Sequence, residues 1–296
     1  MEHVRWLAEP NLRDPTIVYA FTGWNDAGDA ASSAVRALVE RWGATAVAEI
    51  DPEPFTDFAT IRPHVRINDG KRSIVWPTVG LWSASGPGGD VLLVLGPEPS
   101  LRWKLFCAQL VAVAERVGAR MSVSLGALLA DVPHTRPVQI IGTASDPELI
   151  DRFELQRSRY EGPTGIVGVL HDAMANAGIA VASLWAAVPQ YAAQVPSPKA
   201  ALALVERACS LIGSPAPVDA FNSAAAEYDA RIAALIADDD DLVAYVSRLE
   251  SFVDGELDDD DDDDDDTPAG APLDDGNLDE LVAEVEQFLR DRDPNE

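Results

Sequence analysis

The stretch PTIVYAFTGWNDAGDAASSAVRALVERWG (residues 15–43) decides the fold class, because it predicts a buried strand, a polar corner and a helix in direct succession. Residues 15–21 are almost continuously apolar, as a strand of a parallel sheet is when helices cover both its faces. Apolar residues then recur every three or four positions from Ala27 to Trp42, which predicts a helix that ends at Gly43.

The same alternation of strand and helix patterns continues along the chain, which predicts an α/β domain with a mainly parallel sheet. Residues 51–89 are more irregular and predict peripheral antiparallel strands. Further strands are expected over residues 44–50, 90–100, 120–129, 137–145 and 179–189, and further helices over 101–118, 164–178 and 198–213.

Composition indicates a protein of the reducing cytoplasm. Of the 296 residues, 47% are apolar, enough for a substantial core, and only two are cysteines. The first 15 residues lack the continuous apolar segment of a signal peptide. Residues 173–198 carry no charge, but alanine dominates them and proline, glycine and amides interrupt them. We therefore expect a buried strand with flanking turns there and no membrane span.

Acidic residues are concentrated near the C-terminus. The net charge is −28, and residues 237–296 hold 25 of the 50 acidic side chains. A protein so short of basic surface is not expected to bind nucleic acid. The α/β domain is expected to span residues 1–215, followed by a helical extension over 216–256. Residues 257–276 include nine consecutive aspartates and are expected to form a disordered acidic linker.

The pattern of residues 277–292 predicts an amphipathic helix, which Asn277 would cap. One predicted apolar face consists of Leu278, Leu281, Val282, Val285, Phe288 and Leu289. Such a helix on an acidic tether is expected to dock, either on its own body or a sister subunit, or on a foreign partner. If it occupies the partner surface of the body, truncation at Gly255 should strengthen partner binding.

Four clusters of polar and aromatic residues follow strand-like runs, at residues 23–30, 96–106, 129–137 and 160–170. Ligands of parallel α/β sheets bind outside the carboxyl ends of the strands, so these corners are expected to meet at one edge and form a cleft. The candidate cleft residues are Trp24, Asn25, Asp26, Asp29, Arg102, Trp103, His134, Thr135, Arg136, Tyr160, Glu161 and Thr164.

Each candidate also has a structural interpretation. Asn25 and Asp26 are suited to capping the following helix. Arg102 can pair with Glu98, Arg136 can hold its loop in place, and His134 can be a structural loop histidine. In the same way Thr164 can cap a helix, and Trp24 and Trp103 can be core or interface aromatics.

Common catalytic signatures are absent from the sequence. It contains no G-x-S-x-G, no G-x-x-x-x-G-K-[ST], no H-E-x-x-H and no G-x-G-x-x-G. Four scattered histidines give no metal-binding spacing, and a flexible run of aspartates offers no fixed coordination geometry. No catalytic residue, metal or cofactor is therefore assigned.

Five ordered motifs carry a resemblance to a known family: FTGWNDAGDAA, LGPEPSLRWKLF, LGALLADVPHTRP, YEGPTGIVGVL and SLWAAVPQY. Together they resemble the proteasome assembly chaperone 2 family, in its bacterial stand-alone form, over roughly residues 10–215. The resemblance implies a three-layer α/β/α sandwich similar to nucleoside phosphorylases, and self-association. For archaeal relatives the resemblance implies docking by a C-terminal hydrophobic–tyrosine–any-residue tail, whereas this sequence has RDPNE at that place.

Two functions follow as hypotheses. The first is a non-enzymatic, homo-oligomeric protein-binding factor that resembles an assembly chaperone, with proteasome-related or other protein clients. The alternative is a small-molecule enzyme or binder with a phosphorylase- or hydrolase-like cleft for a nucleoside-like or anionic ligand. In that alternative Arg102 and Arg136 would hold the anion, and Asp26 or Glu161 would be the acid/base group.

Overall fold

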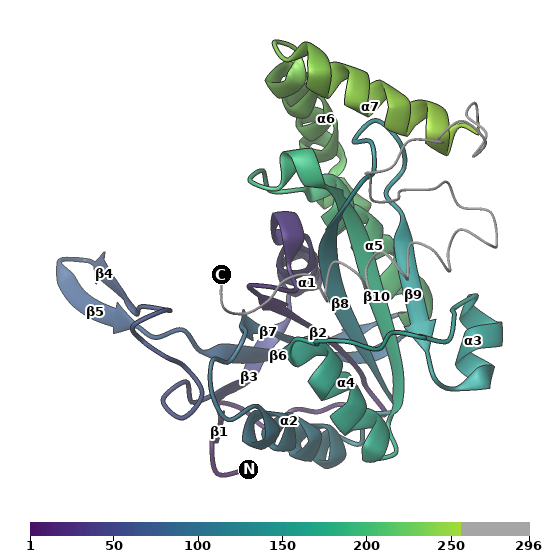
Figure 1. The fold of residues 1–296 in the computed structure, drawn as a ribbon. Helices are drawn as coiled ribbons and strands as arrows, with labels where there is room; N and C mark the ends of the chain where they lie inside the picture. The colour runs from purple at the N-terminus through teal and green to yellow at the C-terminus, as the bar shows by residue number, and fades with distance from the viewer. Residues whose placement is uncertain (256–296) are drawn as a thin grey trace.

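The computed structural model describes residues 1–255 and is built around an eight-stranded sheet in the order β1-β3-β6-β7-β2-β8-β10-β9 (Figure 1). A separate pair, β4-β5, projects from one side of the body as an antiparallel hairpin. The strands are β1 Val4–Trp6, β2 Thr16–Thr22, β3 Thr45–Ile50, β4 His64–Asn68, β5 Lys71–Val75, β6 Val79–Gly86, β7 Gly89–Pro97, β8 Met121–Ala130, β9 Ile140–Ala144 and β10 Ala180–Pro189.

The centre of the sheet is parallel, as the apolar runs predicted. Strand β2 pairs parallel with β7 and β8, and β8 pairs parallel with β10 from Met121↔Ala180 to Ala130↔Pro189. The outer pairings, β1-β3, β3-β6, β6-β7 and β10-β9, are antiparallel. Residues 16–21 of β2 are all buried, because helices cover both faces of these strands.

Two layers of helices enclose the sheet, so the predicted three-layer α/β/α sandwich is confirmed. Helices α1 and α5 pack on one face, where Leu38 and Leu204 share a core with Val18 of β2. Helices α2 and α4 pack on the other face, where Phe106 and Leu170 join Tyr19. The helices are α1 Ala30–Arg41, α2 Trp103–Val117, α3 Pro147–Phe153, α4 Ile166–Asn176, α5 Pro198–Ile212, α6 Asn222–Ile236 and α7 Asp240–Val253, with 3-10 turns at Ala27–Asp29, Gln190–Ala192 and Val218–Ala220.

After the sandwich, α6 and α7 form the helical extension that the sequence predicted (Figure 1). They share a small apolar core, in which Tyr228 and Ile232 of α6 and Val246 of α7 pack with Val195. The carboxylate of Asp239 accepts a hydrogen bond from the backbone N of Leu242 at 3.0 Å and caps α7. The expected linker over 257–276 and amphipathic helix over 277–292, with its six docking residues, lie outside the described residues.

Two short elements were missed by the sequence analysis. Strand β1 has three residues, too few to show a period, and pairs antiparallel with β3. Helix α3 has seven residues and begins at Pro147, where Asp146 accepts a hydrogen bond from the backbone N of Glu148 at 2.9 Å. The dipeptide Asp146-Pro147 is a helix-start signal that would have located α3.

Candidate functional site

Asn25 and Asp26 form the corner between β2 and α1. The backbone O of Asn25 accepts a hydrogen bond from the backbone N of Ala127 at 2.9 Å, which ties the corner to β8. Oδ1 of Asp26 accepts one from the backbone N of Ser32 in the first turn of α1, at 3.0 Å. The N-cap residue of α1 is Asp29, but Asp26 binds a first-turn N–H of the helix, which agrees with the structural one of its two sequence interpretations. The side chain of Asn25 instead donates to Glu98.

Glu98, which follows β7, joins this corner to α4. Its Oε1 accepts hydrogen bonds from Nδ2 of Asn25 at 3.0 Å and from the backbone N of Ile166 at 2.9 Å. A Cβ on Gly165 would lie 2.4 Å from Oδ1 of Asn25, so only glycine fits there. The sequence analysis considered Glu98 only as a partner of Arg102. Its position directly after a buried strand is the sequence signal that would have identified this role of Glu98.

A cavity of about 180 Å³ lies beside this junction. Trp24 and Asn25 from one predicted corner line it together with Tyr160 and Thr164 from another, and Trp185 of β10 adds a third aromatic ring. Neither lysine nor arginine is among its lining residues. The cavity is therefore suited to a small uncharged molecule and offers no cation to an anion.

The polar groups around this cavity are few. Ser183 Oγ accepts hydrogen bonds from Trp185 Nε1 at 3.0 Å and from Ser124 Oγ at 2.8 Å. Oδ1 of Asn25 is buried and has no hydrogen-bond partner among the described residues. Burial lowers the pKa of His171, which also lines the cavity, so this imidazole is neutral near pH 7.

A second hollow, of about 480 Å³, shares Trp24 with this cavity and is lined further by Asp26, Asp29, Leu129 and Gln194. Burial raises the pKa of Asp26, and the neighbouring carboxylate of Asp29 acts in the same direction. Oδ2 of Asp26 is buried without a partner within residues 1–255. Two carboxyl groups at the start of α1 oppose the binding of an anion there, despite the helix dipole.

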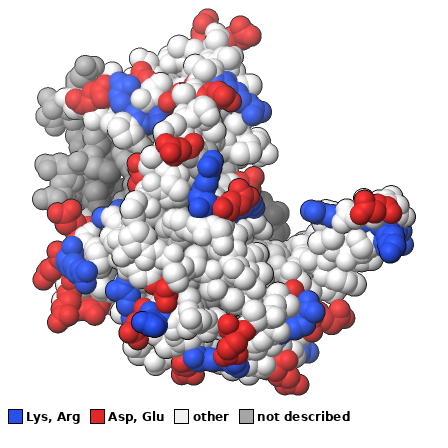
Figure 2. Space-filling model, turned by 180° about the vertical axis from the view of Figure 1, so that it is seen from behind, with Lys and Arg blue, Asp and Glu red and all other residues white. Residues whose placement is uncertain are grey.

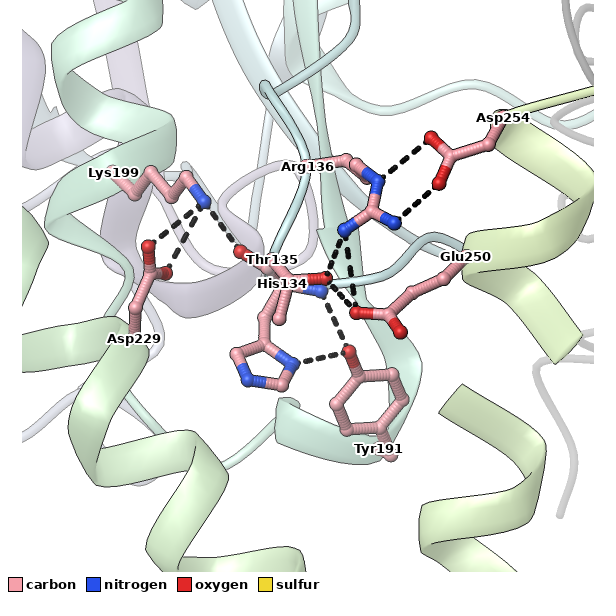
Figure 3. Close-up of polar contacts among 8 residues, drawn as sticks. All are labelled: His134, Thr135, Arg136, Tyr191, Lys199, Asp229, Glu250 and Asp254. Atoms are coloured by element: carbon pink, nitrogen blue, oxygen red, sulfur yellow. Dashed lines mark hydrogen bonds and ion pairs between the residues drawn. The ribbon is translucent and has the colours of Figure 1, made fainter. Parts of the chain in front are cut away.

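The loop after β8 contacts the helical extension (Figure 3). None of residues 131–139 lines the cavity of about 180 Å³. The guanidinium of Arg136 forms ion pairs with Asp254 and with Glu250, the latter at 3.4 Å between Nη1 and Oε1. Thr135 donates a hydrogen bond to the same Glu250 carboxylate. The pKa of Asp254 is lowered, chiefly by the hydrogen bond from Arg136. The anions beside Arg136 are thus carboxylates of its own chain.

His134 is hydrogen-bonded to a neighbouring tyrosine, and these contacts support its interpretation as a structural loop histidine (Figure 3). Its backbone N donates to Oη of Tyr191 at 2.7 Å, and its Nδ1 lies 2.9 Å from the same oxygen. Lys199 donates to the backbone O of His134 and pairs with Asp229 of α6 at 3.0 Å. The pKa of His134 is lowered, mainly by burial.

The remaining candidates lie apart from both groups. Arg102 is exposed in a left-handed conformation (φ 52°) at the start of α2, and it lines none of the cavities described above. Trp103 packs against the core on the α2 face, and its Nε1 donates to the backbone O of Pro99. Glu161 is exposed in the loop before α4.

The predicted corners therefore divide into two groups at the carboxyl end of the sheet. Trp24, Asn25, Tyr160 and Thr164 meet at one cavity. The loop at residues 134–136 binds α7 and Tyr191. Within residues 1–255 no group of three or more His, Cys, Asp or Glu side chains is arranged to hold a metal ion. Among the helices of those residues, none combines the length and apolar character that a membrane crossing requires.

Comparisons place this fold among known proteins. A family model, described as the PAC2 family, matches residues 20–236. A PAC2 family protein from Streptomyces avermitilis is 45% identical, with 79% of this chain and 100% of that chain covered and a TM-score of 0.73. A proteasome-assembly chaperone homologue from Mycobacterium tuberculosis is 42% identical, with 78% and 99% covered and a TM-score of 0.71.

An archaeal proteasome activator from Pyrococcus furiosus shares the fold alone. It is 15% identical, with 78% of this chain and 97% of that chain covered and a TM-score of 0.65. No curated protein sequence matches the chain.

Proposed function

Because the chain belongs to the PAC2 family, we propose that it is a protein-binding factor that resembles a proteasome assembly chaperone. The observation that carries this proposal is the 42% identity to a proteasome-assembly chaperone homologue over 99% of that chain. We propose proteasome subunits as clients, a homo-oligomeric assembly, and action in the cytoplasm.

The contacts at the carboxyl edge of the sheet support a non-enzymatic role. Asp26 binds a first-turn N–H of α1, Glu98 joins β7 to α4, and Arg136 binds the carboxylates of Glu250 and Asp254 in and directly after α7. Asp26 and Arg136, two of the groups that the acid/base or anion-binding alternative names, are thus engaged in holding the fold.

Reconstitution with proteasome subunits tests this proposal. Free α- and β-type subunits from the same organism are mixed with the full-length chain, and assembly is followed by native gel electrophoresis over time. We expect the chain to migrate with free subunits or half-assembled particles, and to increase the rate at which complete particles form.

The acidic C-terminal segment requires its own control, since 19 of its 41 residues (256–296) are acidic and can bind basic proteins unspecifically. A synthetic peptide of residues 256–296, at equal concentration, should leave the assembly rate unchanged. The proposal would be contradicted if the full-length chain failed both to migrate with the subunits and to accelerate their assembly.

The cavity beside Trp24 favours a second candidate function, the binding of a small uncharged ring compound. Aromatic residues Trp24, Tyr160 and Trp185 surround it, and its lining lacks lysine and arginine. A ligand that binds only the folded chain raises its melting temperature, as linkage requires. We expect such a rise with uncharged bases and indoles, and none with inorganic phosphate.

Ser158 lines the cavity and is exposed, so Ser158→Trp should fill the cavity and abolish the rise. Ser210→Trp, at an exposed position of α5, is the matched control and should retain it. If the rise is equal in both variants, the ligand binds elsewhere.

A further inference from the structure

The hairpin of β4 and β5, residues 64–75, forms an arm that stands clear of the body (Figures 1 and 2). Asp69 and Gly70 connect its strands with positive φ angles of 49° and 73°, as a tight hairpin turn requires. Every residue of both strands is exposed, and the strands pair only with each other. An isolated two-stranded hairpin is marginally stable in water, so this arm is a surface that a partner would stabilise.

The two faces of the arm differ in chemistry. Residues directly opposite in an antiparallel pair share a face, so Val65, Ile74, Ile67 and Arg72 lie together. Val65, Ile67 and Ile74 are 50%, 71% and 43% exposed, which is unusual for aliphatic side chains of a strand. The opposite face carries mainly polar and basic side chains, namely His64, Arg66, Asn68, Lys71 and Ser73, beside Val75.

The charge of the arm is opposite to that of the chain. Residues 62–75 contain four basic side chains and one acidic one, whereas the whole chain has a net charge of −28. The ion pairs found within residues 1–255 involve other basic groups, so Arg66, Lys71 and Arg72 have no carboxylate partner there. A fitting partner therefore presents aliphatic and acidic groups together.

We propose that the arm binds the C-terminal segment of its own chain, residues 256–296. This segment holds 19 acidic and two basic residues, the opposite of the arm in sign. The pattern of residues 277–292 predicts an apolar face, including Leu281, Val285 and Phe288, that matches the aliphatic face of the arm. Acidic residues between these positions meet Arg72 on the same face, and the aspartates at 258–266 meet Arg66 and Lys71 on the opposite face.

The chain between the body and this predicted helix is long enough for the contact. Residues 256–276 span up to about 70 Å when extended. A folded body of 255 residues has a radius of gyration of about 18 Å, so the segment can reach across it. Repulsion among the aspartates favours extended conformations of this connection. Once bound, the segment covers the arm and keeps it from contact with other proteins.

Carbodiimide coupling of the full-length chain tests the proposal, because it joins a lysine amine directly to a carboxylate in contact with it. The chain has three lysines, so the products are few. We expect Lys71 to couple to carboxylates of residues 256–296 several-fold more than Lys104, which is exposed on α2. Raising the salt from 0.1 M to 1 M shortens the Debye length from about 10 Å to about 3 Å and should reduce this coupling.

An equal mixture of unlabelled and 15N-labelled chain distinguishes the two possible sources of the segment. Coupled peptides of uniform label mean that arm and segment belong to one chain, as proposed. Mixed labels in half of the products would overturn the proposal and make a second copy the occupant. Coupling at Lys71 no greater than at Lys104 would overturn it too.

Two pairs of variants separate the forces involved. Arg66→Glu with Arg72→Glu should reduce coupling at Lys71 several-fold, whereas Arg36→Glu, exposed on α1, should not. Ile67→Asp should also reduce coupling at Lys71, because it places a charge on the aliphatic face of the arm. Val243→Asp, at an exposed position of α7, should leave this coupling unchanged. Equal effects of arm and control variants would count against a specific contact. None of these outcomes depends on whether proteasome subunits are clients.

Discussion

At the scale of single residues, buried polar side chains connect segments that are far apart in the chain. Asn25 is 1% exposed, and its amide reaches Glu98, which in turn accepts the first backbone N–H of α4. Such a junction is stable because each buried group that it pairs would otherwise lose its hydrogen bonds to water. Its geometry depends on glycine at position 165, where the backbone passes close to Asn25.

We predict that Gly165→Ala destabilises the protein by about 1–3 kcal/mol, as overpacking of a well-packed site does. The added Cβ would lie 2.4 Å from Oδ1 of Asn25, and neither the backbone nor the buried amide can yield easily. Urea denaturation measures the change. Gly86→Ala is the control, because its Cβ would meet no atom nearer than the Ser214 hydroxyl at 3.3 Å and the backbone O of Gly89 at 3.8 Å.

A second variant makes this prediction specific to the pair. Asn25→Ala removes the clash partner, so the double variant should cost less than the sum of the two single ones. Strict additivity would show that position 165 matters for another reason.

We also predict a pH dependence from His134. Its pKa in the folded state is lowered, mainly by burial, whereas in the unfolded chain it lies near the ordinary value of about 6.5. The unfolded state therefore binds more protons near that pH, and stability falls as the pH is lowered through 6.5.

Urea denaturation between pH 5.5 and 7.5 tests this dependence. The loss of stability at low pH should be smaller in His134→Asn, whose amide can keep the bond to Tyr191. The control is His64→Asn on the exposed arm, which should follow the native curve. Parallel curves for all three proteins would refute the role of His134.

At the scale of elements, the loop after β8 attaches the helical extension to the sandwich. Arg136 forms ion pairs with Glu250 of α7 and with Asp254 directly after it. Tyr245 of α7 donates a hydrogen bond to Asp131 at 2.6 Å. Lys199 forms an ion pair with Asp229 of α6. The apolar core between α6 and α7 is small, so these polar contacts set how firmly α7 is held.

We predict that Arg136→Ala loosens α7 without unfolding the sandwich. Backbone amides of Asp240–Val253 should exchange with deuterium faster, because local opening costs less once the ion pairs are gone. Amides of β2 and β8 should keep their protection. Hydrogen exchange with mass spectrometry measures both regions in one experiment.

Arg5→Ala provides the comparison, since Arg5 pairs with Glu49 at the far edge of the sheet. It should leave exchange in α7 unchanged. Equal exchange of α7 in native and Arg136→Ala proteins would show that the apolar core alone holds the helix.

At the scale of the whole molecule, the sandwich and the arm are separable. The sandwich buries its strands on both faces, whereas each residue of β4 and β5 is exposed. The arm therefore contributes little to the stability of residues 1–255 and is available for contact with another segment.

We predict that replacing residues 64–75 by three glycines leaves the melting temperature within about 2 °C, because surface changes rarely exceed about 0.5 kcal/mol. The replacement fits because His64 and Val75 are paired neighbours at the base of the hairpin. Calorimetry checks the result. Ile232→Ala, in the core of the helical extension, shows the sensitivity of the assay, since it should cost about 2–5 kcal/mol. A large loss of stability without the arm would mean that it packs on the body.

Much of the fold was predictable because its signals are local. Apolar runs and three-to-four-residue periods located the long strands and helices, including β2, α1 and β10. The three residues of β1 and the seven of α3 were missed because short elements do not establish a period. The candidate site was predictable in part: Trp24 and Thr164 do meet at a cavity, but Arg136 does not join them.

The sequence by itself determined the order of strands and helices, the buried centre of the sheet and the position of the acidic segment, because these depend on side chains near one another in the chain. Only the tertiary structure decided which polar groups meet. Arg136 finds its carboxylates 114 and 118 residues away, and Glu98 finds Asn25 and Ile166 at separations of 73 and 68 residues. Such pairings depend on how the layers pack, since a charge or an amide can pair with any suitable group that folding brings within hydrogen-bond distance.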